Sequence, residues 1–275
     1  MRVFISIDIE GIAGVASTTH TVPGELGYKD GCRWMTAEAR AACEGARAAG
    51  ATSILIADSH GPGTNLILDA LPEDVEVVSS WPRPMSMMQG VNEGFDVALL
   101  MGYHTGAHHA EGAFAHTFHG RQISKVSLNG EAATELTVSA AIAGQFGVPI
   151  ALVTGDEATC QQGKDIIGDS LTVAAVKSDY GRESIRSLMP AAAQNFVREQ
   201  TKIALTSPLP DLYTVKGPVQ IDVQFKHHWT AEVLSYLPMM TRTDAYTVRY
   251  KCRDMAEAAG VFHFITSYTP TPKFT

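Results

Sequence analysis

The chain of 275 residues is 45% hydrophobic and 18% charged, the proportions of an ordinary globular protein. Its net charge of −8, with no run of lysine or arginine, argues against nucleic acid and anionic membranes as partners. No apolar stretch approaches the length that crosses a bilayer, so we expect no membrane association.

The cysteines and the N-terminus indicate the compartment. The four cysteines are scattered, without Cys-x-x-Cys spacing, which suits reduced thiols better than a disulfide framework. The first residues do not resemble a signal peptide, because Asp8 and Glu10 interrupt the apolar run. We therefore predict a cytoplasmic protein.

The first predicted strand, residues 2–11, is an apolar run that ends in Asp8 and Glu10 before Gly11. Side chains alternate along a strand, so the two carboxylates point the same way. Two like charges at this place repel each other and are costly to desolvate, which makes sense if a cation lies between them. The alternative is that one carboxylate caps a turn while the other is solvated.

Helices and short apolar strands alternate along the rest of the first two thirds of the chain. The predicted helices span residues 30–49, 131–146 and 187–204, and the further strands span residues 52–57, 75–78, 95–101, 148–153 and 171–176. Residues 122–128, turned by Asn129-Gly130, predict a hairpin. This alternation predicts an α/β fold with a mostly parallel sheet and helices on both faces.

The pattern of the sequence changes near residue 207, where a proline-containing stretch precedes further predicted strands. Pro208 and Pro210 lie in a linker-like stretch, and strands are predicted at residues 219–225 and 245–250. We predict an α/β metal-binding catalytic domain at residues 1–206, a smaller C-terminal β-rich α+β subdomain at residues 207–268, and a tail at residues 269–275.

Two further predicted strands end in histidine, at His60 and His104, next to glycines that let a backbone approach a ligand. Ligands of parallel sheets bind beyond the carboxyl ends of the strands, where Asp8 and Glu10 also lie. Mixed carboxylate and histidine ligation without cysteine suits Zn²⁺, Mn²⁺ or Co²⁺. Two carboxylates and two histidines can support a two-metal centre if one carboxylate bridges the ions.

Other catalytic motifs are absent from the sequence. It contains no Gly-x-Gly-x-x-Gly, P-loop, His-Glu-x-x-His or Gly-x-Ser-x-Gly motif. Metal-assisted hydrolysis is therefore the reaction class that the residues favour.

A set of short motifs occurs along the chain in a specific order. These are Ser6-Ile7-Asp8-Ile9-Glu10-Gly11-Ile12, Asp58-Ser59-His60, Gly102-Tyr103-His104, His116 and Glu135-Leu136. Together with the long loop after the first strand, they resemble the DppA-type D-aminopeptidases, the zinc-dependent peptidase family M55. The resemblance extends over most of the chain, to about Thr266.

The resemblance implies a hydrolase with two zinc ions (Zn²⁺) per chain. Asp8 would bridge the ions, and the remaining ligands would be Glu10, His60, His104 and Glu135. His116 would be the catalytic residue, as nucleophile, general base or oxyanion partner. The family further implies a ring-shaped homodecamer that limits the substrates to short peptides, with removal of N-terminal D-amino acids from peptides such as D-Ala-D-Ala.

Several assignments stay open at this point. His108, His109 and His119 compete with His116, and Glu131 competes with Glu135. Lys177 could bind a substrate carboxylate, although a solvated lysine is the simpler interpretation. The substrate could be an L-peptide or another small amide, and a catalytically dead metal-stabilised binding or assembly protein is a third reading.

Overall fold

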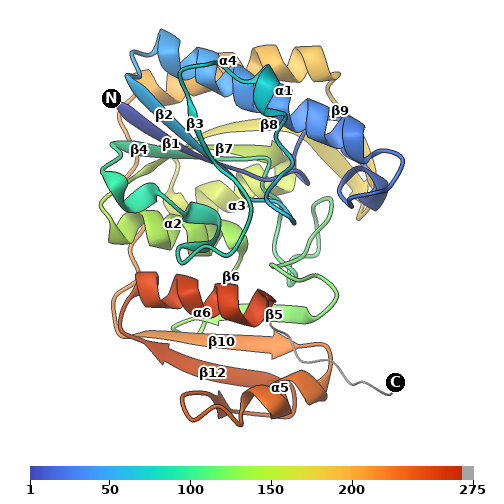
Figure 1. The fold of residues 1–275 in the computed structure, drawn as a ribbon, viewed down its shortest axis with the longest axis vertical. Coiled ribbons are helices and arrows are strands. Elements are labelled where there is room, and N and C mark those ends of the chain that lie inside the picture. Colours follow the sequence, from blue (N-terminus) through green and yellow to red (C-terminus); the bar gives the residue numbers. More distant parts are fainter. Residues whose placement is uncertain (268–275) are drawn as a thin grey trace.

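The computed structural model describes residues 1–267, and the predicted tail at residues 269–275 lies outside this range. Two sheets organise these residues (Figure 1). Within residues 1–267, no helix combines the length and the apolar character needed to span a membrane.

The larger sheet has seven strands in the order β3-β2-β1-β4-β7-β8-β9. The neighbouring strands from β3 to β8 are parallel, and β9 pairs antiparallel with β8. In this order the strands are β3 (Glu76–Val78), β2 (Ser53–Asp58), β1 (Arg2–Ile7), β4 (Val97–Met101), β7 (Ile150–Asp156), β8 (Thr172–Gly181) and β9 (Ser184–Ser187). The central position of β1 places the residues that follow it at the middle of the sheet edge.

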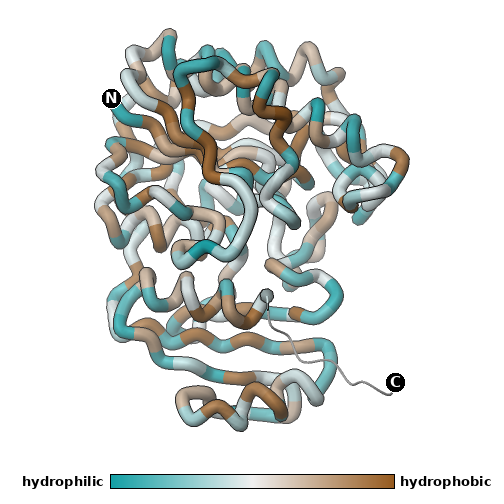
Figure 2. The backbone as a smooth tube through the Cα atoms, viewed as in Figure 1, coloured by the Kyte–Doolittle hydropathy of each residue, from teal (hydrophilic) through white to brown (hydrophobic). Residues whose placement is uncertain are grey.

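Helices cover both faces of this sheet, as predicted (Figure 1). On one face α1 (Tyr28–Ala48) packs against α4 (Pro190–Thr206), and the other face carries α2 (Glu135–Gln145) and α3 (Glu157–Ile167). The alternation along β1 explains the two layers, because Val3 and Ile5 join the apolar core under α1 whereas Phe4 joins the core under α2. Figure 2 shows the hydrophobic residues concentrated along these strands.

The smaller sheet is antiparallel, in the order β11-β12-β10-β5-β6. Its strands are β11 (Thr241–Arg242), β12 (Thr247–Cys252), β10 (Val219–Phe225), β5 (Ile123–Leu128) and β6 (Glu131–Ala133). Two of them come from the middle of the chain, so this sheet is not built from the C-terminal residues alone. The α/β fold class with an additional antiparallel portion is confirmed.

Two helices accompany the smaller sheet. These are α5 (His228–Leu234) and α6 (Met255–Ser267). Helix α6 contacts both α2 and the strands β10 and β12, and it lies between the two sheets in Figure 1. Four short 3₁₀ helices complete the described elements: η1 (Thr18–His20), η2 (Leu68–Ala70), η3 (Ser86–Met88) and η4 (Val91–Glu93).

The start of α2 differs from the sequence prediction in a way that affects the site. Asn129 and Gly130 both have positive φ, 51° and 92°, and turn β5 into β6. Residues 131–133 therefore continue the hairpin, and the helix begins only after Thr134, whose hydroxyl accepts from the backbone of Thr137. The prediction of a helix from residue 131 was wrong for this reason.

Candidate active site

The predicted site residues converge at one edge of the larger sheet. They follow the carboxyl ends of three strands, lie in the loop after β4, or open α2. They are Asp8 and Glu10 after β1, His60 after β2, His104 after β4, His116 in the following loop and Glu135 at the first position of α2. All six line or border one cavity of about 360 Å³ between this edge and α6.

Asp8 lies between two imidazoles. Its Oδ1 is 3.0 Å from His60 Nδ1, and its Oδ2 is 3.4 Å from His104 Nε2. Glu10 Oε2 lies 2.9 Å from the same nitrogen of His60, and Glu135 Oε1 lies 3.5 Å from that of His104. The carboxylate of Asp8 thus has one oxygen toward each half of the cluster, as a bridging ligand requires.

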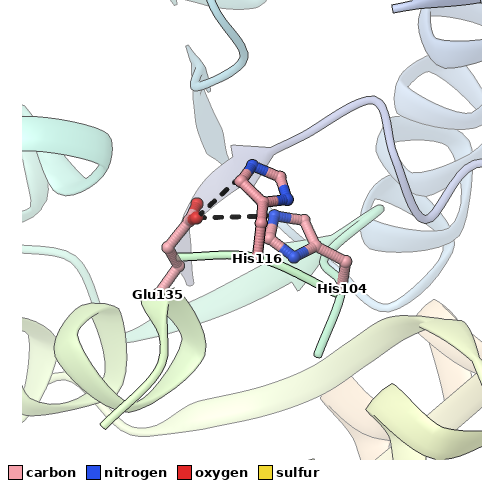
Figure 3. Close-up of side chains that lie close together, drawn as sticks. All are labelled: His104, His116 and Glu135. Atoms are coloured by element: carbon pink, nitrogen blue, oxygen red, sulfur yellow. Dashed lines mark ion pairs between the residues drawn. The ribbon is translucent and has the colours of Figure 1, made fainter. Parts of the chain in front are cut away.

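His116 adds a third imidazole to the second half of the cluster. Its ring stacks on that of His104, with centroids 4.0 Å apart and an interplanar angle of 10°. Its Nε2 lies 3.9 Å from Glu135 Oε1, and Figure 3 shows both histidines directed at this carboxylate. The geometry therefore also permits His116 to share an ion with His104 and Glu135.

Each of these imidazoles is anchored by a backbone carbonyl. The contacts are His60 Nε2 to Thr21 O at 2.8 Å, His104 Nδ1 to Thr105 O at 3.0 Å, and His116 Nδ1 to Phe114 O at 2.7 Å. A carbonyl can only accept, so in the neutral ring the nitrogen that faces it carries the hydrogen. The other nitrogen then presents its lone pair to the carboxylates, which is the arrangement of metal-binding histidines.

Two buried atoms of the cluster make no hydrogen bond among the described residues. They are Glu10 Oε2 and His104 Nε2. Each lies within ion-pair distance of an oppositely charged group, but not with hydrogen-bond geometry. Buried polar atoms are normally satisfied, so the donor set fits a cation placed among these atoms. Asp8, Glu10 and His104 form one group that could hold an ion, and His104, His116 and Glu135 form another.

The charges of the cluster depend on one another. Burial disfavours the charged form of His60, but the facing carboxylates of Glu10 and Asp8 hold its pKa well above the usual value. Burial likewise opposes ionisation of Asp8, but the facing imidazoles of His104 and His60 hold its pKa well below the usual value. Without a metal, the carboxylates are therefore compensated by protons on the histidines.

Residues beneath the site fix its backbone. Lys177 is buried and donates to the carbonyls of Glu10, Ile12 and Val15, at 3.1 and 2.8 Å for the last two. It is thus neither solvated nor directed at a substrate, in contrast to both sequence interpretations. The sequence around Lys177 does not indicate this role, because its partners are main-chain atoms 162 to 167 residues away.

Two other carboxylates at strand ends have structural roles. Asp58 accepts hydrogen bonds from the backbone of Asn65 and Leu66, which orders the loop that carries His60. Asp156 caps α3 by accepting from Thr159 N at 2.8 Å.

Other residues that line the cavity come from segments that are distant in the sequence. Trp81 and His263 stack with centroids 5.3 Å apart, and Phe118 also lines the cavity. Of the histidines that compete with His116, His119 lines the cavity, but no ion pair joins it to Glu135 among the described residues. That α6, from the far end of the chain, borders the site was not predicted from the sequence.

Comparisons with known proteins define the class. The sequence model of the Peptidase_M55 family, described as D-aminopeptidase, matches residues 1–264. The chain therefore belongs to this family, and the resemblance seen in the motifs is confirmed.

Two relatives make the comparison more specific. A D-aminopeptidase of Bacillus subtilis (strain 168) is 30% identical over 261 residues, which cover 94% of both chains. The solved structure of a Zn-dependent D-aminopeptidase DppA from Bacillus subtilis, described as a self-compartmentalizing protease, superposes with a TM-score of 0.94. That match has 28% sequence identity and covers 100% of both chains.

Proposed function

We propose that this chain is a zinc-dependent aminopeptidase that removes N-terminal D-amino-acid residues from short peptides such as D-Ala-D-Ala. Membership of the Peptidase_M55 family supports the reaction, and the zinc-dependent relative of the same fold supports the metal. The observation that carries the proposal is the buried cluster itself. Its three imidazoles each turn one nitrogen to a carbonyl and the other toward carboxylates.

Five residues would hold two zinc ions in this proposal: Asp8, Glu10, His60, His104 and Glu135. Asp8 would bridge, because its two oxygens face different histidines. Zinc bound there would supply Lewis-acid polarisation of the scissile carbonyl.

His116 would be the group that moves the proton. Its Nδ1 donates to Phe114 O, so its Nε2 is free to accept a proton from the attacking water. As the oxygen of that water bonds to the carbonyl carbon and the C–N bond breaks, the same nitrogen would return the proton to the leaving amine. We favour this general-base role over direct nucleophilic attack by His116. The free amine of the substrate would lie near the carboxylates, which compensate its positive charge.

The proposal extends to the assembly and the compartment. The self-compartmentalizing relative supports a homo-oligomer, which the family resemblance implies to be a decamer. Exposed apolar side chains around α5, at Trp229, Tyr236, Met239 and Tyr246, provide contact surface for it. All four cysteines are free and buried, which supports a cytoplasmic location. The division into domains at residue 207 stays a prediction.

The test is metal analysis of the purified chain together with hydrolysis of D-Ala-D-Ala and L-Ala-L-Ala. We expect about two zinc ions per chain, and turnover of the D-peptide that a chelator abolishes and added zinc restores. Preferred turnover of L-Ala-L-Ala would instead assign an L-peptidase. Bound metal without hydrolysis of either peptide would refute the aminopeptidase, and a chain that binds no metal would refute the metal site.

A further inference from the structure

A chain of four hydroxyl groups lies beneath the candidate metal site. Ser59 Oγ is 2.8 Å from Ser6 Oγ, Ser6 Oγ is 2.8 Å from Tyr103 OH, and Tyr103 OH is 3.0 Å from Ser139 Oγ. All four residues are buried, and Ser59 also lines the cavity. Buried hydroxyls in an otherwise apolar core are costly unless they bond to one another.

Each of these hydroxyls belongs to a segment that carries a proposed ligand. The pairs are Ser6 with Asp8, Ser59 with His60, Tyr103 with His104 and Ser139 with Glu135. The first three pairs are neighbours or next neighbours in the chain. The fourth pair is one helical turn apart on α2, so both side chains lie on the same helix face.

The hydrogens of these four hydroxyl groups can be assigned by counting donors and acceptors. Each hydroxyl has one hydrogen to donate, and the carbonyl of Met87 lies 3.0 Å from Ser59 and 3.1 Å from Ser6. If Ser139 donates to Tyr103, Tyr103 to Ser6, Ser6 to Ser59 and Ser59 to this carbonyl, every hydrogen is used once. The four hydroxyls can therefore form one continuous series of hydrogen bonds from α2 to the cavity.

The link between Tyr103 and Ser139 differs from the others. The backbone ladders of the larger sheet already hold β1, β2 and β4 in register, so the relative positions of Asp8, His60 and His104 do not depend on hydroxyls. Helix α2 lies outside that ladder. The Tyr103–Ser139 hydrogen bond ties α2 to the end of β4 directly beneath Glu135.

We infer that Tyr103 is a positioning residue, whose hydroxyl joins α2 to the sheet and so holds Glu135 at the distance from His104 that a shared ion requires. This inference rests on the proposed zinc site. It assigns Tyr103 an effect on metal affinity that a residue serving only the core would not have.

The test compares Tyr103→Phe with Tyr250→Phe in the full chain. Both changes remove one tyrosine hydroxyl, but that of Tyr250 contacts Glu257 and no proposed ligand. We expect Tyr103→Phe to weaken the affinity for at least one zinc ion by about tenfold, measured by competition with a chromogenic chelator. Tyr250→Phe should leave that affinity unchanged, and thermal unfolding of both metal-free variants separates affinity from stability.

Zinc affinity of Tyr103→Phe within twofold of the wild type would overturn the inference, whatever its stability. If that variant does not fold, Ser139→Ala takes its place, because it breaks the same link and retains the bond between Tyr103 and Ser6. Unchanged zinc affinity of Ser139→Ala would also overturn the inference. A wild-type chain that binds no zinc would refute the proposed function, and the inference with it, and this result differs from unchanged affinity in a variant.

Discussion

Two groups of charged residues in this molecule differ in burial and in how fully their polar atoms are hydrogen-bonded. The site cluster at the edge of the larger sheet is buried, and within residues 1–267 its Glu10 Oε2 and His104 Nε2 have no hydrogen bond. In the outer cluster, on the smaller sheet and the start of α6, every carboxylate has hydrogen-bond donors. There Asp222 accepts from both Nε and a terminal nitrogen of Arg249, at 2.6 and 2.9 Å, and Glu257 accepts from Tyr250 and Arg253.

The two clusters differ in whether the protein itself satisfies their carboxylates, and this difference distinguishes a metal-binding site from an ordinary group of ion pairs. In the outer cluster each carboxylate has donors of its own, and part of each pair remains in contact with solvent. In the site cluster only protons on the histidines compensate the carboxylates, and two buried polar atoms have no hydrogen bond among the described residues, so a bound cation would satisfy groups that the protein itself does not. An acidic cluster that completes itself needs no ligand, whereas one that does not is a candidate for binding.

The largest effect should come from Asp8→Ala, which removes the one carboxylate that faces both histidines. We expect zinc affinity to fall by more than about a hundredfold, beyond the loss caused by a missing outer partner of a ligand, and peptide hydrolysis to disappear. Asp222→Ala is the matched control from the outer cluster and should leave zinc content and hydrolysis unchanged. Equal zinc content in the two variants, measured by elemental analysis, would remove Asp8 from the ligand set.

The next effect concerns catalysis rather than binding. His116→Ala should lower kcat for D-Ala-D-Ala by about 10²–10⁴, the usual contribution of a positioned base, while the zinc content stays at the wild-type level. His119→Ala is the control, because His119 lines the same cavity without the contact to Glu135. Full activity of His116→Ala would disprove the catalytic role, and a loss of zinc would assign His116 to the ligands instead.

The sheet and the convergence of the site residues at its edge could be predicted from the sequence. The alternation of apolar strands and helices predicted a parallel sheet, and parallel strands bring their carboxyl ends to one edge, so Asp8, His60 and His104 had to lie near one another. The Asn-Gly turn predicted the hairpin but not that its second strand ends at Ala133, which decides where α2 begins. Local propensity fixes turns well and the lengths of the flanking elements poorly.

Other features of the site depend on contacts that no local pattern encodes. The burial of Lys177 results from main-chain carbonyls of the loop after β1, and the place of His263 results from α6 packing beside α2. The hydroxyl chain joins Ser6 to residues 53 and 97 positions away. Each of these is set by the tertiary arrangement, so the sequence around the residue carries no sign of it.

The smallest effect is a difference in the pH dependence of stability between the two regions. Below the site, Glu38 is buried, and one of its oxygens has no hydrogen-bond partner in the part of the chain that the structure describes. Burial raises its pKa to about 7, although Ala13 N donates to its other oxygen and Lys177 is near. In the unfolded chain this carboxyl loses its proton near pH 4.5. Between these pH values the folded state binds the extra proton, so this group lowers the unfolding free energy as pH rises, by about 3 kcal/mol in all.

Glu257 of the outer cluster has the opposite sign. Hydrogen bonds from Arg253 and Tyr250 lower its pKa to about 2, so the stability it contributes is present above pH 4.5 and is lost as pH falls toward 2. This contribution is small because Arg253 is largely exposed.

Denaturant unfolding of the zinc-saturated wild type, Glu38→Gln and Glu257→Gln at several pH values checks both signs, since the difference from the wild type cancels the groups they share. Glu38→Gln should gain stability relative to the wild type from pH 4.5 to 7, and Glu257→Gln should lose its small deficit as pH falls below 4.5. A flat difference for Glu38→Gln over that range would mean that Glu38 finds a partner in solution. The unpaired carboxylates would then be confined to the metal site, and the contrast between the two regions would rest on the zinc ligands alone.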